Sequence, residues 1–273
     1  MMRFVYFGSD LLKGVFDSLL DTGYLPHRCY VCDDHDSARQ LRAACQHRQI
    51  PVSAGKPHTD TLSLDMAAGV ELFVCAEYPW HIPIPAELKY GVNFHTSLLP
   101  RWAGKTPLPY ILENNGDGAG ITCHYLTNTT DNGPVIDNVV ISLSAQDDLS
   151  TLMCKIKLTA GPFARQIFED FENRHPLTKS QQVPIYHPPY PAHKRYVDFT
   201  QRADDIRKQI RIFGCFGIIV LLNGQQYTVI GANASEFDHP LLPGEVINDD
   251  AWLLSLTVKD GILTLPKKGM TPL

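Results

Sequence analysis

Short apolar runs alternate with segments of helical periodicity over the first 80 residues, and this alternation limits the fold more than any other feature of the chain. Residues 3–7 are typical of a strand, and Ser9 is placed to cap a helix after it. The apolar positions of that helix recur at i, i+4 spacing: Leu11, Leu12, Val15, Phe16, Leu19 and Leu20. Residues 29–32 and 37–48 repeat the strand and the helix, and 70–75 adds another buried strand. This order predicts a parallel sheet covered by helices.

Asn93 and His95 stand two residues apart at the end of a further apolar run. Residues i and i+2 of a strand share a face, so we expect both side chains to project together at the carboxyl end of a parallel strand. Open α/β sheets bind their ligands in the crevice at that end. The pair combines a neutral hydrogen-bond donor with a group that titrates near neutral pH, which suits acyl transfer.

A second motif lies about 35 residues further on, where a turn holds Asp131 and a β-type run follows. The pattern Asn-x-His-x-Ser-Leu-Leu-Pro over 93–100, the later Gly104 and Pro107, and Asp-x-Gly-Pro-Val-Ile over 131–136 together resemble the folate-dependent formyltransferases. This is the family of methionyl-tRNA formyltransferase, and within it the chain is most similar to the N-formyltransferases of nucleotide-linked amino sugars. Many relatives have Pro or Ala where this chain has Thr96.

The resemblance, which covers residues 1–180, implies a catalytic trio of Asn93, His95 and Asp131 and N10-formyltetrahydrofolate as the co-substrate. In formyl transfer, the amide NH₂ of Asn93 suits the stabilisation of an oxyanion. His95 either donates a hydrogen bond to the same oxygen or accepts the amine proton, and the sequence leaves both roles open. Asp131 would favour the charged form of the histidine, because an opposite charge nearby raises the pKa of an imidazole.

Residues 78–85 contain three prolines, which predicts a loop because proline lacks a backbone donor and fixes φ. The resemblance implies that this loop holds the pterin ring of the folate, largely through backbone groups. The candidate cofactor-binding residues are Tyr78, Pro79, Trp80, Ile82, Thr127 and Asn128. For Tyr78 and Trp80, a role in closing the hydrophobic core is an equally good interpretation.

Other side chains with catalytic or metal-binding chemistry have simpler interpretations. Cys29 and Cys32 have the spacing of half a zinc site, but no second cysteine pair follows, so we interpret them as strand residues and predict no metal. His124 and Asp137 fall within strand-like runs and are interpreted as ordinary face residues. The odd number of cysteines, seven, predicts reduced thiols and a cytoplasmic protein.

The expected fold class is α/β, a Rossmann-like parallel-sheet formyltransferase domain followed by a small α+β, barrel-like domain. We place the catalytic domain at 1–180, a proline-rich linker at 181–194 and the C-terminal domain at 195–273. Within the first domain, strands are predicted near 121–127 and 135–143 and a long helix over 149–171. The second domain should open on a helix over 203–211 and continue with short strands over 217–222, 225–232 and 252–258, the last leading into a hairpin at Lys259-Asp260-Gly261.

Charge bears on the partners. The net charge is −5, and from Arg195 onward eight lysines and arginines stand against nine aspartates and glutamates. Nucleic acid is therefore not expected as a partner, since neutralisation of phosphates supplies most of the affinity for it. No apolar run reaches the 18 residues that would cross a bilayer, so no membrane association is expected. A homodimer is one option for the assembly.

The acceptor amine remains open among several classes. A nucleotide-linked amino sugar, used in surface-glycan synthesis, is favoured over initiator methionyl-tRNA. Relatives that bind tRNA carry a basic, glycine-rich insertion after the second strand, whereas residues 33–37 are short and acidic here. Hydroxyornithine or another small amine of siderophore or peptide assembly also fits. A formyltetrahydrofolate hydrolase, which usually carries an N-terminal regulatory domain, and a degenerate binding module fit less well with a chain that opens on the first core strand and has the whole trio.

Overall fold

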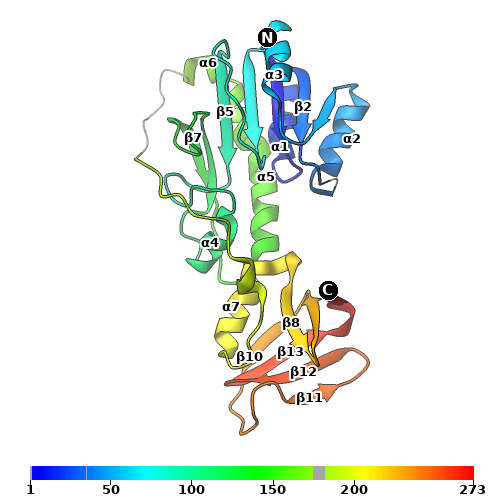
Figure 1. Ribbon diagram of the computed structural model, residues 1–273. Coiled ribbons are helices and arrows are strands. Elements are labelled where there is room, and N and C mark those ends of the chain that lie inside the picture. The colour runs from blue at the N-terminus through cyan, green and yellow to red at the C-terminus, as the bar shows by residue number, and fades with distance from the viewer. Residues whose placement is uncertain (1, 35, 175–181) are drawn as a thin grey trace. The chain divides into compact units, whose positions relative to one another are not determined.

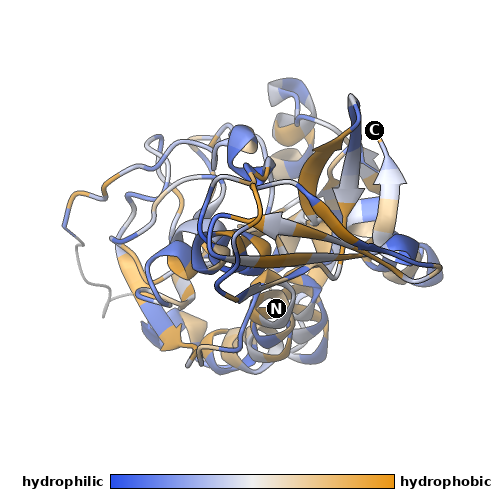
Figure 2. Cartoon of the chain, turned by 90° about the horizontal axis from the view of Figure 1, so that it is seen from below, coloured by the Kyte–Doolittle hydropathy of each residue, from blue (hydrophilic) through white to orange (hydrophobic). Residues whose placement is uncertain are grey.

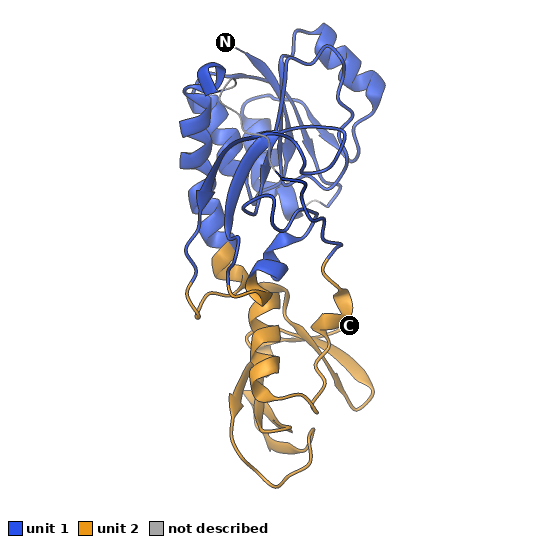
Figure 3. Cartoon of the chain, turned by 90° about the vertical axis from the view of Figure 1, so that its left-hand side faces the viewer, with its two compact units in different colours: residues 1–111, 116–143, 153–189 blue, residues 112–115, 144–152, 190–273 orange. Residues whose placement is uncertain are grey.

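The computed structural model describes residues 2–34, 36–174 and 182–273 and divides into two compact units (Figure 3). The first unit comprises residues 1–111, 116–143 and 153–189, and the second comprises 112–115, 144–152 and 190–273. The domain limits proposed from the sequence stay a prediction. Residues 176–181, with the first proline of the proline-rich stretch, lie outside the described residues.

A seven-stranded sheet with the order β3-β2-β1-β4-β5-β6-β7 forms the centre of the first unit (Figure 1). Its strands are β1 (Arg3–Gly8), β2 (Leu25–Val31), β3 (Val52–Ala54), β4 (Leu72–Ala76), β5 (Tyr90–His95), β6 (Gly120–Tyr125) and β7 (Val135–Val140). The first five strands are parallel, which confirms the Rossmann-like prediction. β6 and β7 are antiparallel to their neighbours. The reason is that His95 pairs with Thr122, so the segment between β5 and β6 stays at one end of the sheet and does not cross back.

Helices cover both faces of this sheet. Phe16 of α1 (Lys13–Asp21) packs edge-on against Phe4 and Tyr6, and Phe163 of α5 (Leu149–Phe168) packs against Phe94. Gly14 and Gly161 let these two helices approach so closely that a Cβ at Gly14 would lie 2.9 Å from the Gly161 nitrogen. α2 (Arg39–His47), α3 (Thr59–Ala67), α4 (Pro107–Glu113), α6 (Phe171–Arg174) and a 3₁₀ turn (Asp36–Ala38) complete the unit.

The opposite face of the sheet carries its own hydrophobic cluster. Val5, Phe7 and Phe73 pack there with Leu62 of α3 and Ile82 of the loop after β4. Figure 2 shows stretches of hydrophobic residues interspersed with hydrophilic ones along the strands and helices of the chain. Successive side chains of β5 point to opposite faces of the sheet. Phe94 therefore faces α5, and its neighbours Asn93 and His95 face the side of α3 and the loop.

Ser9 does not cap α1, which is a correction to the sequence prediction. The helix begins at Lys13 without a side-chain cap, and the Ser9 hydroxyl accepts only from the Leu11 N–H at 3.3 Å. Residues 10–12 form a turn instead, because the Asp10 carboxylate accepts from the N–H groups of Gln40 and Leu41 at 2.9 and 2.8 Å. Asp10 thus caps the first turn of α2 rather than serving its own helix.

The second unit contains a helix and two antiparallel sheets. α7 (Ala203–Phe213) opens it after a short 3₁₀ turn (Ala192–Arg195), and another (Gly214–Phe216) follows. One sheet has the order β10-β13-β12-β11 and the other the order β14-β9-β8. The strands are β8 (Ile218–Leu222), β9 (Gln225–Val229), β10 (Asn233–Glu236), β11 (Val246–Asp249), β12 (Leu253–Val258), β13 (Gly261–Pro266) and β14 (Met270–Pro272), with a 3₁₀ turn at Lys267–Gly269.

The hairpin prediction holds in this unit, since Val258 pairs directly with Gly261 across the turn. The core gathers apolar side chains from α7 and both sheets, among them Ile206, Val220 and Leu263. Across the described residues of the whole chain, no helix is long and apolar enough to cross a bilayer.

Candidate active site

β5 carries Asn93 and His95 to the carboxyl end of the parallel part of the sheet. Asn93 pairs with Cys75 of β4 on one side and with His124 of β6 on the other, so it lies between two strands deep in the sheet. A pocket of about 480 Å³ opens at this end, and both side chains line it. The position is the one at which open α/β sheets bind their ligands.

Asp131 reaches the same pocket from the turn between β6 and β7. Its backbone is left-handed, with φ of 51°, and its carboxylate accepts from the Gly104 N–H at 2.8 Å. Gly133 makes the turn possible, because a Cβ there would overlap the Tyr125 carbonyl oxygen. A non-glycine residue held in this conformation is strained, and such strain is concentrated at functional sites.

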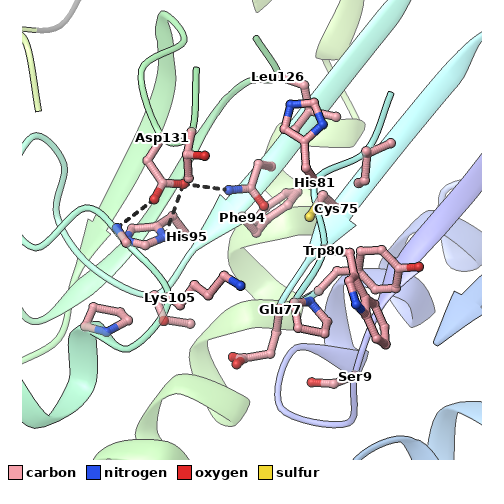
Figure 4. A pocket seen from close by; sticks show the side chains of 18 of the residues that line it. Ser9, Cys75, Glu77, Trp80, His81, Phe94, His95, Lys105, Leu126 and Asp131 are labelled. Carbon is pink, nitrogen blue, oxygen red and sulfur yellow. Dashed lines mark hydrogen bonds and ion pairs between the residues drawn. The ribbon is translucent and has the colours of Figure 1, made fainter. Parts of the chain in front are cut away.

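The three predicted catalytic side chains are in direct contact, and Figure 4 shows Asp131 beside His95. Asp131 Oδ1 lies 3.6 Å from His95 Nδ1, and it accepts a long hydrogen bond of 3.4 Å from Asn93 Nδ2. His95 and Asp131 are 7% and 6% exposed, so water screens their interaction poorly. The structure thus brings together residues that stand 38 positions apart in the sequence.

His95 is held from both sides of its ring. Nε2 lies 3.1 Å from the Trp102 carbonyl oxygen, which can only accept, so Nε2 carries a proton. Nδ1 then faces Asp131 either as a lone pair or, in the imidazolium, as a second donor. Burial lowers the pKa of His95, while Asp131 and the Trp102 carbonyl oppose that shift and His124 reinforces it. The resting ring is therefore neutral, and it lies beside a carboxylate that would stabilise a positive charge on it.

Asp131 is the charged member of the group. Burial alone would raise the pKa of its carboxyl, but His95, His124 and the Gly104 N–H together hold that pKa below its usual value. The carboxylate is therefore ionised at neutral pH, as a stabiliser of an adjacent imidazolium must be.

His124 belongs to this group as well, which corrects its interpretation as an ordinary face residue. It is 2% exposed, and its Nε2 lies 3.0 Å from Asn93 Nδ2 and 3.6 Å from Asp131 Oδ1. The antiparallel register of β6 places residue 124 opposite residue 93, and no local pattern in the sequence reveals that register. Without that register, a histidine inside an apolar run carries no such information.

Most of the candidate folate-binding residues line the same pocket. Tyr78, Pro79, Trp80 and Ile82 form part of its wall after β4, and Thr127 contributes from the segment that follows β6. Asn128 is exposed and is not among the described residues that line the pocket.

Tyr78 also has a structural role that bears on the alternative left open above. Its hydroxyl donates to the Gly55 carbonyl, and its ring packs edge-on against Phe7 and Trp80 at 5.5 and 5.2 Å between centroids. Tyr78 therefore anchors the loop to the sheet. Trp80 extends this aromatic wall and is turned toward the pocket in Figure 4.

Glu77 is a pocket residue that the sequence did not single out. It follows β4 with a left-handed φ of 62°, and it is exposed at the wall of the pocket. Desolvation of its carboxyl by the neighbouring protein raises the pKa of Glu77 to about 7. A strained residue with a displaced pKa in a cleft is a candidate for a functional role. Its left-handed backbone has no signature in the sequence, because glutamate is not a residue typical of that conformation.

The part of the chain that the structure describes contains no set of side chains suited to bind a metal ion. No group of three or more His, Cys, Asp or Glu side chains there has the arrangement to hold an ion. All seven cysteines are free thiols, and Cys29 is buried within β2, as expected of a strand residue.

Comparison with known proteins agrees with this geometry. Residues 28–162 match the formyl transferase family. A methionyl-tRNA formyltransferase from Ehrlichia canis is 27% identical over 181 residues, which are 64% of this chain and 57% of that protein. Another from Treponema denticola is 29% identical over 152 residues, or 54% of this chain and 46% of that protein. The chain thus spans about half the length of these curated relatives.

Solved structures resemble the chain over nearly its whole length. WlaRD, a sugar 3N-formyl transferase crystallised in the presence of dTDP and 5-N-formyl-THF, has a TM-score of 0.69 at 15% identity and covers 98% of both chains. An N-formyltransferase from Helicobacter canadensis, in complex with folinic acid and dTDP-3-aminofucose, has a TM-score of 0.62 at 14% identity and covers 97% of this chain and 99% of its own. At such identities the likeness establishes a shared fold that includes both units.

Proposed function

We propose that this chain, whose residues 28–162 match the formyl transferase family, moves the formyl group of N10-formyltetrahydrofolate to a primary amine carried by a nucleotide-linked sugar. The observation that carries the proposal is the contact of Asn93, His95 and Asp131 in one pocket at the carboxyl end of β5. N10-formyltetrahydrofolate supplies an activated formyl carbon and the acceptor supplies the amine. Side chains must stabilise the oxyanion and transfer the proton.

The pocket suits a folate. Its volume of about 480 Å³ lies within the range of small-molecule sites, and Tyr78, Trp80, Ile82 and Leu126 offer an aromatic and apolar wall for a flat ring. Neighbours of the same fold were crystallised with 5-N-formyl-THF or folinic acid. Displacement of folinic acid measured by calorimetry would test the assignment, and Trp80→Ala should weaken binding.

Each member of the trio has one task in the transfer. The acceptor nitrogen attacks the formyl carbon, the bond from that carbon to N10 breaks, and one amine proton passes to N10. Asn93 donates a hydrogen bond to the oxyanion, which typically contributes about 10² to 10³ in rate per donor. His95 takes the amine proton on Nδ1 and returns it to the leaving nitrogen. Asp131 stabilises the imidazolium in between, across 3.6 Å.

Lys105 supports an acidic group on the acceptor. It is the only lysine or arginine among the described residues that line the pocket, and its side chain extends into that pocket in Figure 4. Its backbone is fixed next to the trio, because Gly104 bonds Asp131 on one side and closely approaches the His187 carbonyl on the other. A lysine in this position suits a diphosphate, which a nucleotide-linked sugar has.

The acceptor is tested by product analysis. Wild-type protein, N10-formyltetrahydrofolate and dTDP-, UDP- or GDP-linked amino sugars should give one formylated sugar by mass spectrometry. Lys105→Gln should raise KM for that acceptor about tenfold or more and leave KM for the folate unchanged, with Lys56→Gln, a lysine outside the pocket, as the control. Formylation of hydroxyornithine, and of no nucleotide sugar, would replace the sugar with a small amine.

Methionyl-tRNA is the second candidate, because the curated relatives quoted above are named for it. Charge argues against it: the chain carries a net charge of −5, with eight basic against nine acidic residues from Arg195 onward. Binding of tRNA should therefore be weak. A tight complex with initiator tRNA, in which log K falls with log salt by roughly 0.7 to 0.9 per phosphate contact, would favour this candidate instead.

A further inference from the structure

His124 contacts two members of the trio, Asn93 and Asp131. Its Nδ1 lies 2.8 Å from the Tyr125 carbonyl oxygen, and its Nε2 lies 3.0 Å from Asn93 Nδ2. A carbonyl only accepts, so Nδ1 must carry the ring proton. An amide NH₂ only donates, so Nε2 must present its lone pair. These two partners together fix one form of the ring, the neutral imidazole with its proton on Nδ1.

Asp131 fixes the orientation of the Asn93 amide by itself, without reference to His124. Its Oδ1 lies 3.4 Å from Asn93 Nδ2, where a carboxylate attracts a donor. With the amide turned by 180°, the Asn93 oxygen would face the carboxylate oxygen at the same distance. The NH₂ of Asn93 is thus required by Asp131 on one side and received by His124 on the other.

We propose that His124 is a positioning residue, whose neutral Nε2 holds the amide of Asn93 with its NH₂ directed at the formyl oxygen. The inference rests on the proposed function, in which Asn93 stabilises the oxyanion. One hydrogen of the NH₂ is bound firmly to His124 at 3.0 Å. The hydrogen bond of the other to Asp131 is long, at 3.4 Å, and therefore weak, so this hydrogen is the one that can be donated to an oxyanion.

A proton on Nε2 would undo this arrangement. Two donors would then face each other across 3.0 Å, and relief by rotating the amide would set the Asn93 oxygen against Asp131. The titratable groups that face His124 are Asp131 at 3.6 Å and His95, whose pKa His124 lowers. In this arrangement only His95 moves a proton during turnover, while the lone pair of His124 Nε2 holds the Asn93 amide.

Two substitutions separate this role from simple packing. His124→Gln can present its side-chain oxygen to Asn93 and does not titrate, whereas His124→Met fills similar space and presents no strong acceptor. We expect kcat to fall by up to about 10² in His124→Met, the order of one oxyanion donor, and to be largely restored in His124→Gln. KM for the folate should change little in either variant.

The structural half of the proposal has a test that needs no turnover. Nitrogen-15 NMR of the imidazole in the wild-type protein should show Nδ1 protonated and Nε2 unprotonated at neutral pH. A protonated Nε2, or equal losses of kcat in the two variants, would overturn the proposal. If the NMR result holds while no amine is formylated, the proposed function fails and the assigned geometry of His124 stands.

Discussion

Replacing Asp131 by Asn removes one charge from the centre of the site and exchanges the carboxylate oxygen that accepts from Asn93 for an amide NH₂. The side chain keeps its size. Its remaining oxygen can still accept from the Gly104 N–H, which lies 2.8 Å from the Asp131 carboxylate in the wild type. What disappears is the attraction between the carboxylate and the positive charge that His95 acquires when it takes the amine proton. We expect kcat to fall and the pKa of His95 to fall with it, because a favourable neighbouring charge is lost.

The size of the effect follows from the 3.6 Å between Asp131 Oδ1 and His95 Nδ1. At an effective dielectric constant of about 20, two unit charges at this distance attract each other by about 4 to 5 kcal/mol. Each 1.4 kcal/mol of transition-state stabilisation is worth roughly a factor of ten in rate. The ceiling is therefore about 10³ in kcat, and with part of the charge formed in the transition state we expect roughly 10² to 10³.

Kinetics and NMR test this together. Asp21→Asn serves as the control. It removes the same charge from Asp21 of α1, which forms an exposed ion pair with Arg165 of α5. The control should keep kcat and the His95 pKa of the wild type, whereas Asp131→Asn should lower both. An unchanged His95 pKa in Asp131→Asn would show that the two groups are not coupled, and Asp131 would then be a residue of its turn alone.

Other substitutions have equally defined outcomes. His95→Asn should lose about 10² to 10⁴ of kcat while calorimetry shows folinic acid still bound. Burial lowers the pKa of His95 below its usual 6.5, so as pH falls below 6.5 His95 is protonated more readily in the unfolded chain than in the folded one. Urea unfolding from pH 7 to 5 should therefore show a smaller loss of stability in His95→Asn than in wild type. Equal losses would contradict the shift. Gly104→Ala should destabilise the fold by more than about 1 kcal/mol in the same assay, since φ is 123° and a Cβ would overlap the His187 carbonyl oxygen; a wild-type denaturation midpoint would refute the clash.

The pattern of the sequence predicted those parts of the fold that depend on local periodicity. The positions of α1, with Phe16 and Leu19 buried, follow from helical spacing, and the sharing of one face by Asn93 and His95 follows from the period of two in β5. β3 and α3 were not predicted. β3 has three residues, and α3 leaves Leu64 70% exposed, so neither presents a regular apolar pattern.

The site was predicted as far as its motifs extend. Asn93, His95 and Asp131 each stand in a patterned segment, whereas His124 and Glu77 join the pocket through strand register and a left-handed backbone. Neither register nor a positive φ at glutamate is encoded in a local pattern. For the same reason the Asp10 carboxylate, which caps α2 from 30 positions away, was passed over in favour of Ser9.

The measurement that tests the central claim most directly is the stoichiometry of a single turnover. Protein in excess over N10-formyltetrahydrofolate is mixed with and without a nucleotide-linked amino sugar, and tetrahydrofolate and formylated amine are quantified in the same sample. The account predicts one formylated amine for each tetrahydrofolate released, negligible release without the acceptor, and loss of both products in His95→Asn. Steady release of tetrahydrofolate and formate with no amine present would identify a hydrolase and contradict the account.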